Sequence, residues 1–285
     1  MPRSTPCRSR PAEVFRPLPC IAEGVLAVAA RSARAFPRHS HDQFGIGLIL
    51  RGAQASASGR GEVESGPGAL VTVNPGEVHD GRPIGGARVW TMLYLDPGLV
   101  ATARAGLAGG TGEEFTRPVI EGTDLPGLFD ELYRAATGPA GDAGRMAFDA
   151  ALGEVVLRLC SGRSAAEPSH TPGVLMARDY LHDRRDDGVR LADLAAAAGL
   201  SPFHLTRAFR AAFGLPPHAY LLQLKVAQAR RLIASGLPLS RAAAEAGFAD
   251  QSHLTRIFTR QFGYSPAVFA RSQRKNVQDR GRRRS

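Results

Sequence analysis

Two stretches of the sequence repeat a pattern of side chains that suits contact with a nucleic acid. His204-Leu-Thr-Arg-Ala-Phe209 recurs as His253-Leu-Thr-Arg-Ile-Phe258, 49 positions later. Arginine binds phosphates and reads guanine edges, and hydroxyl or amide side chains contact other base edges in the major groove. The matched Arg207 and Arg256 are therefore the first candidates for ligand recognition.

The repeat is longer than these six residues, which indicates a duplicated structural unit. Further residues match at the same offset, namely Phe213, Gly214, Pro217 and Tyr220 with Phe262, Gly263, Pro266 and Phe269. Upstream the offset is 48, and it joins Leu191, Ala195 and Gly199 to Leu239, Ala243 and Gly247. Each copy reads as a helix, a glycine-containing turn and a second helix, which is the plan of a helix-turn-helix unit.

The second helix of each copy has one apolar face and one polar face. Leu205, Phe209 and Phe213 lie four residues apart, so they form a face that we expect to be buried. The opposite faces are predicted to contact DNA through Phe203, Thr206, Arg207 and Arg210 in the first copy and Gln251, Ser252, Thr255, Arg256 and Arg260 in the second. Polar faces that only meet water are the alternative for a single unit, but the duplication and its matched arginines favour DNA.

The distribution of charge supports a polyanionic partner. The chain has 285 residues and a formal net charge of +10. Up to His170 it holds 17 Lys and Arg against 18 Asp and Glu, whereas from Thr171 onward it holds 19 against 8, a net of +11. Each cation that meets a phosphate releases a condensed counterion, so this concentration of charge suits DNA binding. A solvated basic surface with a disordered tail is the alternative from charge alone.

The remaining bulk features favour an intracellular setting. The three cysteines, Cys7, Cys20 and Cys160, form no CxxC or Cys/His cluster, so reduced thiols are the simplest expectation. Residues 1–11 lack the apolar core of a secretory signal, and no stretch approaches the roughly 20 apolar residues that span a bilayer. We therefore expect a cytoplasmic protein with no membrane partner.

The elements that position these residues change character along the chain. Between residues 35 and 95, short apolar runs alternate with turn formers such as Asn74-Pro75-Gly76, which predicts antiparallel β structure. The clearest strands are expected at residues 45–50, 69–73 and 89–95, in a small barrel or sandwich. Apolar residues at a spacing of three and four predict amphipathic helices at 125–136 and 145–159, whose apolar stripes pack on the barrel or on another subunit.

From residue 174 onward the sequence predicts only helices. They are expected at residues 174–182, 191–198, 202–213, 218–234, 239–246, 250–262 and 266–270. The helix at 218–234 connects the two units, and it is long enough to place two recognition helices in successive major-groove turns, about 34 Å apart.

This C-terminal pattern resembles the AraC-type transcription regulators over residues 174–270. The second unit carries the most characteristic residues, Gly247-Phe-Ala-Asp250-Gln-Ser252 and Gly263-Tyr-Ser-Pro266. The resemblance assigns base-facing positions to Phe203, Thr206 and Arg207 in the first recognition helix and to Gln251, Ser252, Thr255 and Arg256 in the second. Lys225 departs from the arginine that the family usually has, and a lysine lacks the planar fork of a bidentate contact.

The N-terminal half resembles the cupin-type sensor domain of the same family. His39-Ser-His41 and Gly76-Glu-Val-His79 are similar to the two cupin motifs. Metal-binding cupins also have a carboxylate where this chain has Gly45 and Ile46, so we expect neither a metal nor a cofactor. The three histidines, His39, His41 and His79, are expected to line or support a pocket for an organic effector, or to make structural hydrogen bonds.

The resemblance implies an α+β multidomain fold in four parts. Residues 1–166 form a cupin-like β-barrel with two flanking helices that senses an effector and dimerises, and 167–173 form a linker. Residues 174–272 form an all-α DNA-binding domain of two helix-turn-helix units joined by a long helix, and 273–285 form a basic disordered tail.

The implied function is that of a sequence-specific transcription regulator, an effector-responsive activator and not an enzyme. Its expected partners are double-stranded promoter DNA, a small-molecule effector, RNA polymerase and a second copy of the chain. Two alternatives remain at this point. They are a metal-dependent cupin enzyme fused to a DNA-binding domain, and an architectural protein that binds DNA without sequence preference.

Overall fold

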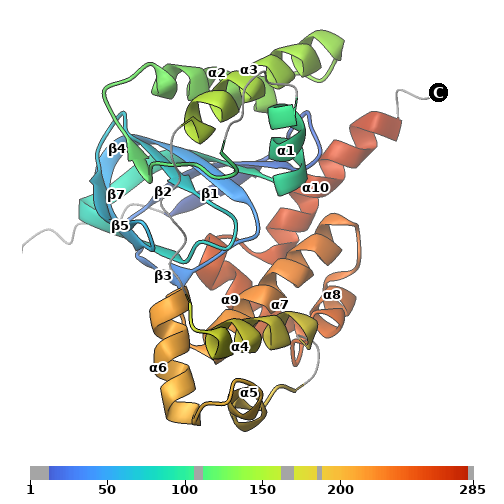
Figure 1. Cartoon of the computed structure of the whole chain (residues 1–285). Helices are drawn as coiled ribbons and strands as arrows, with labels where there is room; N and C mark the ends of the chain where they lie inside the picture. The colour runs from blue at the N-terminus through green and yellow to red at the C-terminus, as the bar shows by residue number, and fades with distance from the viewer. Residues whose placement is uncertain (1–12, 106–111, 162–169, 185–187, 282–285) are drawn as a thin grey trace, which may run out of the picture.

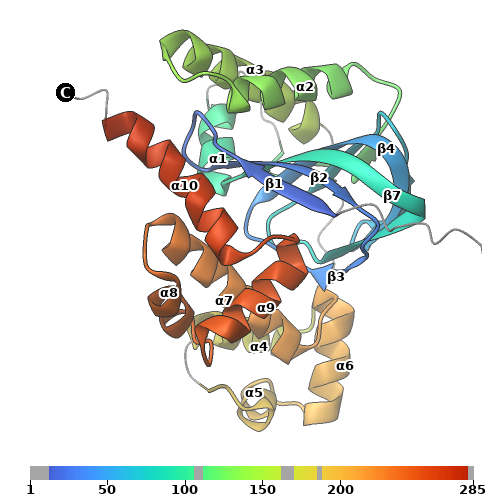
Figure 2. The same ribbon diagram turned by 180° about the vertical axis from the view of Figure 1, so that it is seen from behind.

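The computed structural model describes residues 13–105, 112–161, 170–184 and 188–281, in a β-rich domain followed by a helical one (Figure 1). Residues 1–12, the first three residues of the expected linker (167–169) and the last four residues of the expected tail (282–285) lie outside these ranges. The helical domain lies against one side of the sheet, whereas α2 (Leu125–Thr137) and α3 (Asp142–Cys160) cover the other side (Figures 1 and 2).

The β-rich domain is one curved sheet. Its strands are β1 (Val14–Leu18), β2 (Val25–Ser32), β3 (Phe36–His39), β4 (Phe44–Ser58), β5 (Gly61–Ser65), β6 (Leu70–Val73), β7 (His79–Leu95) and β8 (Val119–Ile120). Hydrogen bonds join them in the order β1-β2-β7-β4-β6-β8, with β3 beside β7 and β5 beside β4. The long antiparallel pair of β4 and β7 changes register near Arg51, so the sheet bends there.

The expected strands at 45–50, 69–73 and 89–95 are confirmed, within β4, at β6 and within β7. The prediction nevertheless began the β structure at residue 35 and so missed β1 and β2. Six of the eight residues of β2 are buried, without a regular alternation. A strand buried on both faces lacks the period of two that identifies a half-buried strand, which explains the omission.

Helices α1 (Pro97–Ala105), α2 (Leu125–Thr137) and α3 (Asp142–Cys160) follow the main strands. The apolar stripes of α2 and α3 pack on the sheet, because Phe129, Leu132, Phe148 and Leu152 belong to the same buried core as Ile46 and its neighbours. Of the two packing partners that the sequence left open, the structure shows the chain's own sheet for these apolar stripes.

The helical domain contains α4 (Pro172–Asp183), α5 (Leu191–Ala197), α6 (Pro202–Phe213), α7 (Pro217–Ala234), α8 (Leu239–Glu245), α9 (Gln251–Phe262) and α10 (Pro266–Gly281). Each predicted helix is present with nearly the expected bounds, except the last. α10 continues to Gly281, so the prediction of a disordered tail is wrong for residues 273–281. Extending an existing helix adds one hydrogen bond per residue, and this segment has no proline to stop it.

Three buried cores divide the molecule differently from its domains. One core lies between the sheet and α2 and α3. A second joins Leu26, Val28 and Met92 of the sheet to Phe258 and Phe269 of the second helix-turn-helix unit. The third belongs to α4 and the first unit, around Leu205 and Phe209. The second unit therefore shares a core with the sheet, and the first unit has a core of its own.

Candidate DNA-binding surface and ligand pocket

The two recognition helices, α6 and α9, are built from the same local interactions. An oxygen of the N-cap residue, Ser201 in α6 and Asp250 in α9, accepts a hydrogen bond from the backbone N–H three residues later. Both helices end at a glycine with a left-handed backbone, Gly214 at φ 73° and Gly263 at φ 82°. The duplicated sequence thus gives duplicated ends, which set the same length and orientation of the helix in each unit.

The inward faces of the two helices match, although Phe213, which was also expected to be buried, is only half-buried, as is its counterpart Phe262. Leu205 and Phe209 of α6 and Leu254 and Phe258 of α9 are each 0% exposed. With these residues buried, the opposite faces point to solvent: Phe203 is 71% exposed, and Arg207, Arg210, Arg256 and Arg260 are all exposed.

The two threonines on these outer faces use their hydroxyl donors within the helix. The Thr206 hydroxyl donates to the carbonyl of Pro202, and the Thr255 hydroxyl donates to the carbonyl of Gln251, each at 2.8 Å. Their methyl groups and the remaining lone pairs are left for contact with a base. Thr206 and Thr255 are therefore better suited to packing on a thymine methyl than to donating a hydrogen bond.

The predicted residues of α9 surround a shallow hollow. Its lining contains Gln251, Ser252, Thr255, Arg256 and Arg260, together with Thr259 and Arg34. Arg34 belongs to the β-rich domain, between β2 and β3, and its guanidinium donates to the carbonyl oxygens of Thr259 (3.4 Å) and Arg260 (3.0 Å). A side chain of the β-rich domain therefore contributes positive charge beside the second recognition helix.

The outward arginines have no acidic partner within the described ranges. None of Arg207, Arg210, Arg256 and Arg260 takes part in the ion pairs found there, although other surface arginines such as Arg241 do. An unpaired guanidinium can bind a phosphate or a guanine edge without first breaking an ion pair.

The connecting helix α7 has 18 residues, which corresponds to about 27 Å. Lys225 on this helix donates from Nζ to the carbonyl oxygen of Gly247 at 2.7 Å. Gly247 is in the turn of the second unit and has φ 73°. The lysine therefore makes a single bond that ties α7 to this turn, a role that does not need the planar fork of an arginine.

A cavity of about 110 Å³ lies between the sheet and the second unit. The sheet contributes His39, His79, Arg88 and Trp90 to its lining, along with several apolar side chains. The helical domain contributes Gln261, Phe262 and Tyr264, at and just beyond the end of α9. Anything bound in this cavity would touch both domains.

The three predicted histidines are close together. The ring centroids of His39 and His79 are 4.4 Å apart, and those of His41 and His79 are 5.1 Å apart. His39 and His79 line the cavity, whereas His41 lies behind them, 5% exposed, with its ring against Tyr94. The structure thus places two of the three at the cavity surface and one in support.

Hydrogen bonds determine the tautomer of each ring. Nδ1 of His39, His41 and His79 is 2.8 to 3.0 Å from the carbonyl oxygen of the residue two positions away. Because a carbonyl only accepts, each Nδ1 carries the proton and each Nε2 is a bare acceptor. His41 Nε2 is buried without a partner.

Burial keeps these rings neutral. The pKa of His39 is lowered to about 3, first by burial and then by the positive charge that His79 would carry, and burial lowers the pKa of His79 to about 4. The pKa of His41 is also lowered, first by burial and then by the positive charge that His79 and His39 would carry. At neutral pH the three rings therefore carry no charge, and their Nε2 atoms are hydrogen-bond acceptors.

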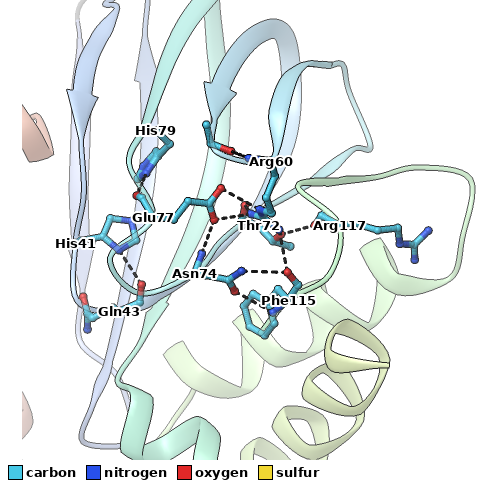
Figure 3. Close-up of polar contacts among 10 residues, drawn as sticks. His41, Gln43, Arg60, Thr72, Asn74, Glu77, His79, Phe115 and Arg117 are labelled. Atoms are coloured by element: carbon cyan, nitrogen blue, oxygen red, sulfur yellow. Dashed lines mark hydrogen bonds and ion pairs between the residues drawn. The ribbon is translucent and has the colours of Figure 1, made fainter. Parts of the chain in front are cut away.

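Glu77, in the second cupin-like motif, is used to hold a turn (Figure 3). Its carboxylate is 2.8 Å from Arg60 Nη2 and accepts a hydrogen bond from the backbone N–H of Asn74. Asn74 in turn is bonded to the backbone of Phe115 through both ends of its amide. This network fixes the loop that presents His79. In the part of the chain that the structure covers, no group of three or more His, Cys, Asp and Glu is arranged to hold a metal ion.

Several contacts join the β-rich domain to the second unit and to α7. Asp42 forms ion pairs with Arg230, at 3.1 Å, and with Arg231. The side-chain amide of Gln261 donates to the carbonyl of Ser40 at 2.8 Å. These bonds, with the shared core, hold α9 against the rim of the cavity.

Comparisons with known proteins agree with both halves of this geometry. A family model of the AraC-like ligand binding domain matches residues 24–155, and a model of a helix-turn-helix domain matches residues 194–272. The chain belongs to the AraC-type transcription regulators. The predicted family, its two-domain fold and its general function as a DNA-binding transcription regulator are therefore confirmed.

Individual relatives show how far the similarity extends. The uncharacterized HTH-type transcriptional regulator YbfI of Bacillus subtilis is 29% identical over 225 residues, which cover 77% of this chain and 81% of the relative. The arabinose operon regulatory protein of Escherichia coli is 24% identical and covers 82% of each chain. A structure of ToxT from Vibrio cholerae with a bound unsaturated fatty acid has a TM-score of 0.53, at 12% identity, over 87% of this chain and 95% of that one.

The sequence did not identify every residue of this AraC-type regulator that borders the two sites. Arg34 and Arg88 are ordinary arginines in the sequence, and Gln261 and Tyr264 are far from the histidines along the chain. Only the packing of the second unit on the sheet brings them together. Gln261 and Tyr264 do differ from their counterparts in the first copy, Ala212 and Leu215, and this difference is the sequence signal that could have pointed to their contact with the cavity.

Among the helices that the structure describes, none combines the length and the apolar composition needed to span a membrane.

Proposed function

We propose that this regulator binds promoter DNA through the outer faces of α6 and α9. The observation that carries the proposal is the pair of matched arginines, Arg207 and Arg256, at equivalent positions of two capped helices. Both are exposed, and neither forms an ion pair with any residue that the structure describes. Phe203, Thr206, Arg210, Gln251, Ser252, Thr255 and Arg260 complete the two surfaces. Arg34, on the rim of the α9 hollow, adds a phosphate contact from the β-rich domain.

Substitution of the matched arginines tests this proposal. We expect Arg207→Ala and Arg256→Ala each to weaken binding to a selected DNA site by about 1–3 kcal/mol, because a lost base contact has that effect. DNA fragments selected by the wild-type protein from a random pool provide the site, and titrations by fluorescence anisotropy give the affinities. Arg134→Ala, an exposed arginine on α2 far from both helices, is the control and should leave affinity unchanged.

The outcome on unselected DNA distinguishes two kinds of protein. If the arginines read sequence, their loss reduces the preference for the selected site over unrelated DNA. Equal losses on all sequences would contradict sequence-specific regulation and would favour an architectural protein.

We further propose that the cavity between the domains is the effector site. Its lining contains the end of α9, so a ligand there can change how the second recognition helix is held. In this proposal the protein acts in the cytoplasm as a homodimer and recruits RNA polymerase when the effector is bound. Sedimentation analysis tests the dimer, and transcription in vitro with purified polymerase tests activation; a monomer or an unchanged transcript level contradicts the respective part.

A further inference from the structure

The cavity contains a buried cation without a counter-ion. Arg88, on β7, lines the cavity and is 1% exposed. Its Nε donates to the side-chain oxygen of Gln54 at 2.8 Å, and its Nη1 donates to the carbonyl oxygen of Arg34 at 3.1 Å. Both acceptors are neutral. Among the described residues, no carboxylate forms an ion pair with Arg88.

The charge on Arg88 persists in spite of its burial. Burial lowers the pKa of Arg88 to about 10, so the guanidinium is still protonated at neutral pH. A buried charge that lacks a partner is strongly unfavourable, and a guanidinium has five N–H donors of which two are used here. The site therefore favours a ligand that brings a negative charge with two acceptor oxygens.

The unused side of the guanidinium is kept open. Nη2 lies next to Gly81, which lines the same cavity, and a Cβ atom at Gly81 would stand 3.6 Å from Nη2. Because glycine has no side chain, nothing from this residue covers the terminal nitrogen. A planar carboxylate matches the geometry of a guanidinium and can accept two parallel hydrogen bonds from it.

The two acidic residues in the lining are already committed elsewhere. Glu77 is bound to Arg60, and one carboxylate oxygen of Asp80 accepts a hydrogen bond from the backbone N–H of Ala57. The Phe36 ring lies beside the cation, with its centroid 5.8 Å from Arg88 Cζ and 6.4 Å from the ring of His39. None of the ion pairs among the described residues joins either acid to Arg88.

The rest of the cavity limits the polarity and the size of the part of the ligand beyond its carboxylate. Trp90 stacks on Arg88, with its ring centroid 4.7 Å from Cζ, and Phe15, Ile49 and Val28 add apolar surface. The volume of about 110 Å³ is of the same order as the ~150 Å³ of a cavity that holds benzene. The space accommodates one small ring or a short branched chain, and it is too small for a long acyl chain.

From these observations we infer that the effector is a compact apolar monocarboxylate whose carboxylate is bound by Arg88. This inference rests on the proposed role of the cavity as the effector site. It adds the chemical class of the ligand and the residue that selects it.

Matched pairs of acids and amides test the selection of charge. Benzoate, phenylacetate and 4-methylpentanoate are compared with benzamide, phenylacetamide and 4-methylpentanamide by calorimetric unfolding of the full-length protein. At about a hundred times its Kd, an acid that fits should raise Tm by roughly 5 °C. By isothermal titration its amide should bind at least tenfold more weakly. Equal effects of acid and amide, or no effect of any acid, would overturn the inference.

Variants assign the effect to Arg88. Arg88→Gln should abolish the preference for acid over amide, and Arg82→Gln, an exposed arginine on the same strand that pairs with Glu62, should retain it. If Arg88→Gln does not fold, Arg88→Lys keeps the charge without the fork and should weaken acid binding at least tenfold relative to wild type. The assignment is refuted if folded Arg88→Gln still prefers the acid over its amide, or if Arg88→Lys binds the acid as tightly as the wild-type protein.

DNA binding is measured in the same samples, so that the two proposals fail separately. If the wild-type protein binds its selected DNA site but responds to no acid, the ligand class is wrong and the regulator proposal stands. If it binds no DNA site selectively, the regulator proposal is wrong, whatever the acids do.

Discussion

The two helix-turn-helix units have the same fold but different surroundings. The first unit meets the β-rich domain at the end of α6, where Arg38 donates to the carbonyl of Gly214 at 3.5 Å and Val78 lies near the same glycine. The second unit shares a core with the sheet, and Gln261 bonds to Ser40. A side chain at Gly263 would meet the ring of Phe15 on β1 at 2.6 Å, so this strand fits closely on the second unit.

This difference shows that the residues shared by the two copies determine the recognition helix itself. The residues that differ, at and just beyond its end, determine which part of the molecule packs against it. The copies agree at the N-cap, at the buried face and at the terminal glycine. They differ where Gln261 and Tyr264 replace Ala212 and Leu215, and these two residues are the ones that reach the cavity. We therefore expect ligand binding to act on the second unit and to leave the first unit unchanged.

Among the substitutions that distinguish the two units, the largest loss of stability is expected at the buried phenylalanines Phe209 and Phe258. Replacing either by alanine should lower the free energy of unfolding of its own core by about 3–5 kcal/mol. Trp90 is the single tryptophan and packs against the core that contains Phe258. Phe258→Ala should therefore shift the urea transition followed by Trp90 fluorescence, whereas Phe209→Ala should shift mainly the helical signal in circular dichroism.

The control for this pair is the wild-type protein followed by both probes. If Phe209→Ala moves the Trp90 transition as far as Phe258→Ala does, the two units unfold as one body. The distinction between a shared core and a separate core would then have no energetic meaning.

A smaller effect is expected from the ion pairs of Asp42. Asp42→Asn leaves Arg230, whose side chain is 9% exposed, with only the more distant Asp96 at 3.8 Å. We expect a loss of about 1–3 kcal/mol, less than for a fully buried pair because Asp42 is 32% exposed. Asp179→Asn removes an ion pair with Arg178 on the surface of α4, and it should change the free energy of unfolding by less than about 1 kcal/mol. Urea unfolding curves of both variants measure the difference, and similar losses would argue against a special role for the interface.

For each residue involved, acidification is expected to have the smallest effect, on the sheet and not on the first unit. The folded pKa values of His39 and His79, about 3 and about 4, lie below the usual 6.5. Between these values the unfolded chain binds more protons, so the free energy of unfolding falls as the pH is lowered from 7. At pH 5 each histidine should account for about 1–2 kcal/mol of this loss.

Unfolding followed by Trp90 fluorescence at pH 7 and pH 5 measures this dependence. His79→Gln should reduce the difference between the two pH values, and His218→Gln, an exposed histidine of α7, should not. An unchanged pH dependence in His79→Gln would mean that this ring is not held neutral by burial.

The parts of the fold that could be predicted are those determined by local sequence. The helices of the C-terminal half have caps, glycines and an apolar spacing that identify them without tertiary information, and α6 has the predicted bounds. β2 was missed because its burial comes from neighbours on both faces, which no local pattern reveals. The extent of α10 was underestimated because a polar segment without an apolar stripe resembles a tail.

The candidate sites divide in the same way. The outward residues of α6 and α9 follow from helical periodicity alone, and their exposure agrees with it. The cavity depends on contacts between residues more than 170 positions apart, such as Ser40 with Gln261. Arg88 has no motif, and only its burial beside neutral partners distinguishes it from the other arginines.

The shared core also determines where this chain can be divided. A fragment that starts at Pro172 keeps every residue of the first unit's own core. It loses Leu26, Val28 and Met92, and so bares the apolar flank of the second unit to water. Such a fragment would tend to self-associate through that flank. By covering this flank, the sheet therefore keeps the DNA-binding half from self-associating, in addition to the sensing role proposed for it.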